Sequence, residues 1–260
     1  MTGTEYGDGA VARAGEILRS VVGSGVHGIA IAGTDDHDEM GVFIEPPAHV
    51  LGMRPPFEHY VHRTQPEGAR SGPGDVDLII YALRKYLRLA LKGNPTALLP
   101  LYAPPADLVV MTPLGEELRE LAPAVLSRRA VRRFLGYMEA QRARMVGGGK
   151  RNRVPNRPEL VEKYGFDVKY ASHALRLAYQ GYEVLRDGRL TLPMADKARE
   201  HVLSVKRGEI PQAEVLESIA KLQLRIEEDL EAGRTPLPPE PEWERLGEWS
   251  TSAYRRHWGW

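Results

Sequence analysis

Cysteine is absent from this chain of 260 residues. Its absence excludes disulfides, a thiol nucleophile and zinc–thiolate sites, so oxygen and imidazole groups are the metal ligands that remain. No apolar run approaches the roughly 18 residues of a membrane span. Glu5 and Asp8 precede the first arginine, Arg13, so the N-terminus does not resemble a secretory signal. We therefore expect a soluble, cytoplasmic protein with no membrane partner.

The chain also lacks net charge, because 35 lysines and arginines balance 35 aspartates and glutamates. Affinity for nucleic acid must then come from local clusters of charge. Ten basic residues lie between Arg128 and Arg157, against a single acidic one, Glu139. Such clusters dominate phosphate binding, so segment 128–157 is the candidate surface for an RNA or tRNA acceptor. Pairing of these arginines with the acidic region 227–244 is the alternative.

Hydrophobic periodicity, prolines and glycines predict the organisation of the chain. A helix is expected over residues 10–22, ending at Gly23-Ser24-Gly25, and a second helix over 82–92. From residue 113 onward the pattern is almost entirely helical. Strands are expected over Val26–Ala32, Met40–Glu45, His59–Arg63 and Asp77–Tyr81. We predict an α+β domain over 1–112, a helical domain over 113–235, and a proline-rich linker with an aromatic tail over 236–260.

Three acidic residues form the candidate chemical site. Asp36 and Asp38 are two residues apart, so on an extended strand both carboxylates point to one face while His37 points away. Asp77 opens another predicted strand. Carboxylates that meet repel one another unless a cation lies between them, and Mg²⁺ prefers such oxygen ligands. A solvated turn is the alternative for the acidic stretch around Asp36.

A Gly-Ser pair, Gly23-Ser24, precedes Asp36 with eleven residues between Ser24 and that aspartate. Glycine lets a backbone approach a phosphate closely, and the serine adds a hydroxyl. A phosphate-binding turn followed by a pair of aspartates and then a third aspartate is a coherent arrangement for phosphoryl transfer assisted by two metal ions.

These motifs resemble the nucleotidyltransferases of the DNA polymerase β superfamily, and more narrowly the RNA-repair-pathway members of that superfamily. The resemblance covers residues 20–240. It depends on Gly23-Ser24, on Asp36-His37-Asp38 leading into Gly41-Val42-Phe43, and on the stretches Asp77–Pro95 and Gly165–Leu177. It implies a mixed sheet with flanking helices, followed by a helical C-terminal domain.

The resemblance also implies an activity, which is transfer of a nucleoside monophosphate from an NTP to an acceptor with release of pyrophosphate. Asp36, Asp38 and Asp77 would be catalytic and would hold two Mg²⁺ ions, with Mn²⁺ as an alternative. Gly23 and Ser24 would hold the terminal phosphates. The acceptor, the preferred base and the oligomeric state are not indicated.

Two positions depart from the family pattern. The residue between the paired aspartates is usually apolar, and here it is His37. The acidic residue expected soon after Asn94-Pro95 is replaced by Leu99. Neither change removes a metal carboxylate, although the second puts an accessory acidic role in doubt.

A basic helix face is the second candidate contact with a nucleotide. Lys169, His173 and Arg176 recur at steps of four and three, so one helix presents them together. The resemblance assigns such cations to the triphosphate, where they would stabilise the charge of the leaving pyrophosphate. A solvated helix face, with His173 simply packed, is the alternative.

Two other functions compete with nucleotidyl transfer. His27, His37-Asp38 and Asp77 superficially match an HD-type metal-dependent phosphohydrolase, although such sites usually lie on helices. The third interpretation is a catalytically silent protein of the same fold that binds nucleotide or RNA.

Overall fold

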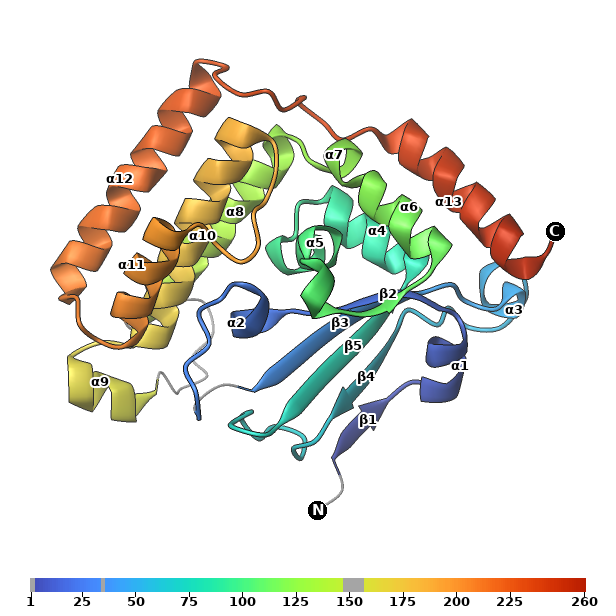
Figure 1. Cartoon of the computed structure of the whole chain (residues 1–260), viewed down its shortest axis with the longest axis horizontal. Helices are drawn as coiled ribbons and strands as arrows, with labels where there is room; N and C mark the ends of the chain where they lie inside the picture. Colours follow the sequence, from blue (N-terminus) through green and yellow to red (C-terminus); the bar gives the residue numbers. More distant parts are fainter. Residues whose placement is uncertain (1–2, 34–35, 147–156) are drawn as a thin grey trace. The chain divides into compact units, whose positions relative to one another are not determined.

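A computed structural model of the chain describes residues 3–33, 36–146 and 157–260 (Figure 1). The chain divides into two compact units: unit 1 comprises residues 1–125 and 241–260, and unit 2 comprises residues 126–240. The fold is mixed α+β, with a six-stranded mixed sheet in unit 1 and helices alone in the described part of unit 2. None of the helices in the described ranges combines the length and apolar character that crossing a bilayer requires.

The strands of unit 1 form one sheet in the order β1-β4-β5-β3-β2-β6. β3 and β5 pair in parallel, and the other neighbours are antiparallel. The strands are β1 (Thr4–Tyr6), β2 (Glu16–Val21), β3 (His37–Phe43), β4 (His59–Arg63), β5 (Val76–Ala82) and β6 (Leu108–Met111).

Helices of unit 1 lie on both faces of this sheet. On one face Ala12 of α1 packs against Phe43, Tyr60 and Ile80, all with no exposed surface. On the other face α5 and α6 pack against β2. The helices are α1 (Gly9–Ala14), α2 (Gly23–Val26), α3 (Pro47–Val50), α4 (Leu83–Leu91), α5 (Pro95–Tyr102), η1 (Pro105–Asp107), α6 (Pro113–Glu120), α7 (Ala122–Val125) and α13 (Trp243–Trp258).

The N-terminal region differs from the sequence prediction. The single helix expected over 10–22 is wrong, because the chain forms α1 and then, after Gly15, the strand β2. A Cβ at Gly15 would overlap the carbonyl of Ile44, so the backbones of these two residues approach closely there. The strand expected over Val26–Ala32 is also wrong: α2 begins at Gly23 and no regular structure follows it up to Gly33. A further strand could not pair with β3, because β2 and β5 already occupy both of its edges.

The C-terminal segment folds back as α13 and belongs to unit 1. Glu117 of α6 accepts hydrogen bonds from Trp249 Nε1 (2.9 Å) and from the guanidinium of Arg256 (2.6 and 2.7 Å). Tyr254 Oη donates to Glu45 Oε2 at 2.7 Å, and Trp258 Nε1 donates to the Glu45 carbonyl at 3.0 Å. Trp249, Tyr254 and Trp258 therefore lie on the packed face of α13, whereas Trp243 and Trp260 are exposed.

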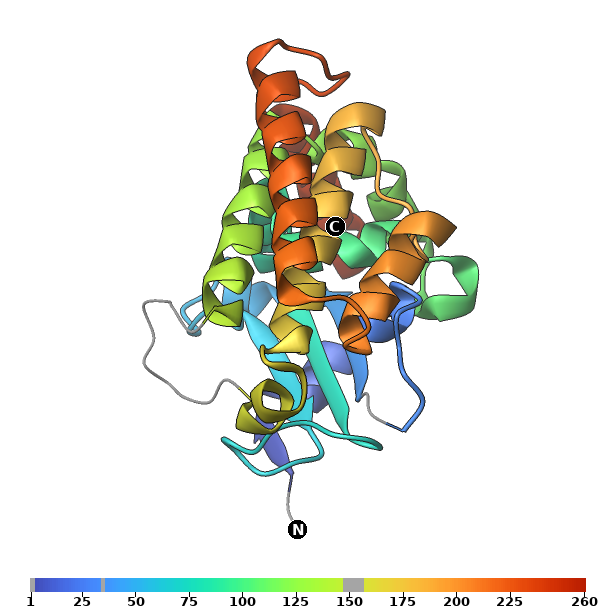
Figure 2. The ribbon, with the colours of Figure 1, turned by 90° about the vertical axis from the view of Figure 1, so that its left-hand side faces the viewer.

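Unit 2 is a helical bundle centred on α10. α10 contacts α8, α11 and α12, and Figure 2 shows α8, α10 and α12 running alongside one another. Asp167 caps α10 by accepting hydrogen bonds from the amides of Lys169 and Tyr170. The helices are α8 (Arg128–Met145), α9 (Pro158–Tyr164), α10 (Val168–Asp187), α11 (Asp196–Lys206) and α12 (Gln212–Glu231).

Candidate metal centre

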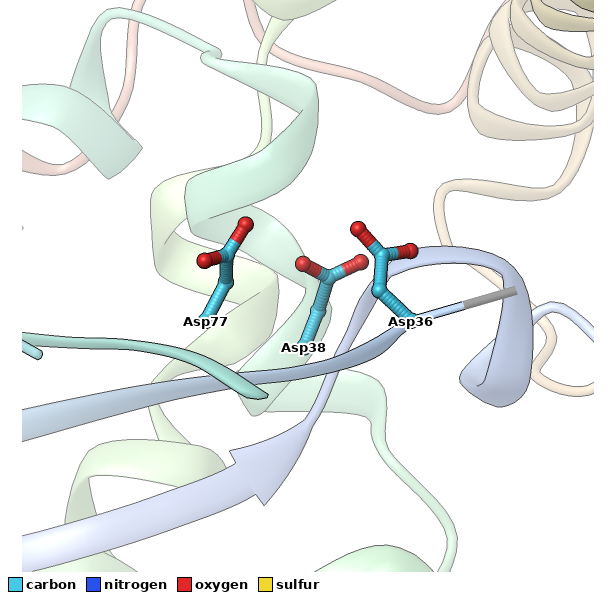
Figure 3. A group of neighbouring side chains, drawn as sticks. All are labelled: Asp36, Asp38 and Asp77. Atoms are coloured by element: carbon cyan, nitrogen blue, oxygen red, sulfur yellow. The ribbon is translucent and has the colours of Figure 1, made fainter. Parts of the chain in front are cut away.

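Three carboxylates converge at one end of the parallel strand pair of unit 1 (Figure 3). Asp38 of β3 lies opposite Asp77 of β5 in the ladder, and Asp36 lies two residues before Asp38. Each aspartate offers one oxygen, and these oxygens all lie within 4.8 Å of one another. Strand alternation predicts that Asp36 and Asp38 share a face, and the parallel register adds Asp77 to it.

His37 points away from this centre, as the alternation predicts. Its Nε2 lies 2.9 Å from Glu39 Oε1, and Glu39 pairs in turn with Arg19 Nη1 at 3.0 Å. This network occupies the opposite face of β3. The departure from the family pattern at residue 37 therefore leaves the three carboxylates in place.

The Gly-Ser turn lies directly beside the paired aspartates. The amide of Val22 donates to the carbonyl of Asp38 at 2.8 Å. Gly23 has a φ of +66°, a conformation that favours glycine, and a Cβ there would overlap the carboxylate of Asp38. Ser24 follows in α2 and is partly exposed. Gly23 and Ser24 thus open α2 after a strand, whereas the sequence predicted that they end a helix.

Asp77 is held by three donors from β4 and the loop after it. Its Oδ1 accepts from Arg63 Nε (2.8 Å) and Gln65 Nε2 (2.7 Å), and its Oδ2 accepts from Ser71 Oγ (2.6 Å). Burial by itself raises the pKa of Asp77, but the hydrogen bonds from Arg63, Ser71 and Gln65 outweigh it, so the pKa lies below its ordinary value. Sequence analysis missed these donors, because only the strand register shows that Arg63 lies opposite Asp77.

These residues fit a hard divalent cation. Three carboxylates supply oxygen ligands, and the three hydrogen bonds to Asp77 leave it one lone pair, on Oδ2. Within the described residues, Asp36, Asp38 and Asp77 form the group of acidic and histidine side chains that lie close enough together to bind a metal. Neither His27 nor His37 belongs to this group. His27 is only 2% exposed, at the end of α2, so the histidine-based hydrolase pattern is not assembled.

The family model of the RNA repair pathway DNA polymerase beta family matches residues 12–251 of the chain. The chain belongs to this family. Among curated proteins and among solved structures, none matches.

Membership of the RNA repair pathway DNA polymerase beta family agrees with the mixed sheet and its flanking helices. It indicates a nucleotidyltransferase-like enzyme, and the acidic triad is compatible with metal binding. Leu99, where an acidic residue was expected, lies within α5, is 2% exposed and therefore belongs to the hydrophobic core.

The basic face expected on a helix lies on α10 in unit 2. Lys169 is partly exposed, and Arg176 Nη1 donates to Gln180 Oε1 at 2.8 Å. Burial, followed by the charges of Arg176 and Lys169, lowers the pKa of His173 to about 3. Burial lowers the pKa of Arg176 to about 10, so this guanidinium stays charged at neutral pH. His173 is therefore neutral there, and the cations of this face are Lys169 and Arg176.

The basic segment 128–157 lies partly on α8, and its residues 147–156 lie outside the described residues. Several of its arginines already have partners. Arg129 pairs with Glu240 at 3.4 Å, Arg142 with Glu139 at 2.8 Å and Arg157 with Asp167 at 3.3 Å. The pairing expected as an alternative thus occurs at Arg129, whereas Arg132 and Arg133 are exposed.

Proposed function

We propose that this protein transfers a nucleoside monophosphate from an NTP to an acceptor and releases pyrophosphate. An oxygen of the acceptor attacks the α-phosphorus, a new P–O bond forms, and the bond to the bridging oxygen of the pyrophosphate breaks. When the attacking group is a hydroxyl, its proton passes to solvent water. The observation that carries this proposal is the convergence of Asp36, Asp38 and Asp77 beside Gly23, in a chain of a nucleotidyltransferase family.

Asp36, Asp38 and Asp77 are the residues that would hold the metal, for which we propose two Mg²⁺ ions, with Mn²⁺ as an alternative. Such a cation supplies Lewis-acid polarisation of the phosphoryl oxygens when it is bound. The hydrogen bonds to Asp77 keep this carboxylate ionised. An ionised carboxylate suits a metal ligand, whereas the pKa of a proton acceptor should lie near the operating pH.

In unit 1, Gly23 and Ser24 are proposed to hold the terminal phosphates of the nucleotide. In unit 2, the face of α10 that carries Lys169, Arg176 and neutral His173 is proposed as a phosphate contact through its two cations. Fixed positive charges stabilise the charge that develops on leaving pyrophosphate. The acceptor is proposed to be an RNA or tRNA that contacts the exposed arginines of segment 128–157.

The experiment supplies each α-labelled NTP with Mg²⁺ and a panel of acceptors: RNAs with different ends, tRNA, a protein and small alcohols. We expect label in one acceptor, equimolar pyrophosphate, and a decrease of about 100-fold or more in Asp38→Asn. Asp107→Asn, in η1 of the same unit, is the matched control and should keep full activity. Transfer that survives Asp38→Asn, or phosphate release that needs no acceptor, would contradict the proposal.

A further inference from the structure

The sheet face that carries the acidic triad continues away from it as a row of aromatic side chains. Ladder partners and alternate residues of a strand share a face. Asp38 is opposite Asp77, and Tyr81, four residues along β5, is opposite His59 of β4. Tyr6 of β1 is opposite Val61, two residues after His59. The rings of Tyr81, His59 and Tyr6 therefore lie on the same face as the metal carboxylates.

These three rings contact one another across three neighbouring strands. The centroids of Tyr6 and His59 are 5.2 Å apart and their planes differ by 28°, which is a stacked arrangement. The centroids of His59 and Tyr81 are 6.1 Å apart with a tilt of 49°. Tyr6 is 63% exposed, and His59 and Tyr81 are partly exposed. We name these three residues the aromatic row.

Side chains between the aromatic row and the triad are also accessible. Val61 and Ile79 are partly exposed, and Arg63 extends this face to Asp77. On the opposite face of the same strands, Tyr60 and Ile80 have no exposed surface. The accessible face is thus the one that leads to the candidate metal centre. Figure 1 shows β5, β4 and β1 as neighbouring strands, at the end of the sheet away from β2.

We infer that the aromatic row is a stacking platform for the bases of a single-stranded RNA acceptor whose reacting end lies at the triad. This inference rests on the proposed function. Aromatic rings bind bases of any sequence through their faces, which suits an enzyme that acts on a strand end.

The strand geometry sets the length of acceptor that reaches the row. Tyr81 lies four residues from Asp77 along β5, which is about 13 Å at about 3.3 Å per residue. A stacked strand rises about 3.4 Å per nucleotide, so the row meets the fourth nucleotide or so from the reacting end. A dinucleotide acceptor is too short to use it.

Binding tests this platform without turnover. The anisotropy of a fluorescein-labelled ten-nucleotide RNA is measured with the full chain, without NTP. We expect Tyr6→Leu/Tyr81→Leu to bind it about fivefold more weakly or worse, and Tyr6→Leu alone, at the exposed edge, to bind it measurably more weakly. Trp260→Leu is the matched control, because Trp260 of the same unit is 66% exposed. Its affinity should equal that of the wild type.

A second measurement locates the contact. An RNA with 5-iodouridine at the fourth position from the reacting end should crosslink on irradiation to Tyr6 or Tyr81, as read by mass spectrometry. The platform would be overturned by equal RNA affinity in all variants or by crosslinks confined to other residues. It would also be overturned by ring-dependent binding of a peptide but not of RNA. Ring-dependent RNA binding without any transfer from NTP would uphold the platform and refute the proposed function. Transfer from NTP to RNA whose rate is unchanged in the ring variants would uphold the proposed function and refute the platform.

Discussion

Gly23 and Asp38 are packed so closely that the glycine has no room for a side chain. The φ of Gly23 is +66°, and a Cβ at this position would overlap the carboxylate of Asp38. The amide of the preceding residue, Val22, also bonds to the Asp38 carbonyl. The turn and the aspartate are therefore held together, and the glycine at residue 23 sets the position of a proposed metal ligand.

Gly23→Ala should displace the Asp38 carboxylate and weaken metal binding by about tenfold or more, the effect of disturbing a group that orients a ligand. Positive φ adds a strain of about 1 kcal/mol to any alanine there. Gly233→Ala isolates that strain, since Gly233 has a φ of +67° and a Cβ there would meet no atom within 4 Å. Titration with Mn²⁺ by calorimetry compares the two variants. Equal metal affinity in both would show that the overlap with Asp38 has no effect.

Divalent metal should stabilise the folded protein. Three carboxylates whose oxygens lie within 4.8 Å of one another repel each other without a cation. At a metal concentration of 100 times Kd, the gain is about 2.7 kcal/mol. This gain raises Tm by on the order of 5–10 °C. Asp38→Asn should lose this rise and, without metal, melt no lower than the wild type, because it relieves repulsion. Scanning calorimetry with Mg²⁺ and with EDTA measures both; a full rise in the variant would contradict the site.

Much of the site could be predicted from sequence because its signals are local. Asp36 and Asp38 are two residues apart, so alternation alone puts them on one face. The strand that begins near Asp77 has a clear alternating pattern, and the helix after it follows at once as α4. These features need no knowledge of distant partners.

The parts that could not be predicted depend on pairing between distant segments. The apolar residues of β2 have spacings that fit a helix, yet this segment forms a strand that pairs along both of its edges, with β3 and with β6. The donors to Asp77 come from β4 and its loop, and only the register brings Arg63 opposite Asp77. Likewise, nothing in the sequence indicated that Trp249 of α13 would bond to Glu117 of α6.

Tyr254→Phe should destabilise unit 1 by about 1–3 kcal/mol, because it removes a donor from a buried carboxylate. Glu45 is 6% exposed and accepts the Tyr254 hydroxyl at 2.7 Å. Burial raises the pKa of Glu45, and the Tyr254 bond opposes that rise. The loss of stability in the variant should become smaller as the pH falls and Glu45 is protonated. Urea unfolding of the variant and the wild type at pH 7 and pH 5 measures this loss. Tyr6→Phe, which removes an exposed hydroxyl, is the control and should match the wild type at both values.

His173→Gln should make the stability of unit 2 less dependent on pH. Burial, together with the positive charges of Arg176, Lys169, Arg157 and Lys206, lowers the pKa of His173 to about 3. Between pH 6.5 and that value, the unfolded chain binds a proton at this position and the folded chain does not. Stability therefore falls with decreasing pH, by roughly 1 kcal/mol per pH unit from this residue. Urea unfolding of the wild type and the variant between pH 7 and pH 5 should give a steeper loss for the wild type. Parallel losses would show that His173 takes up its proton in the folded state as readily as in the unfolded one.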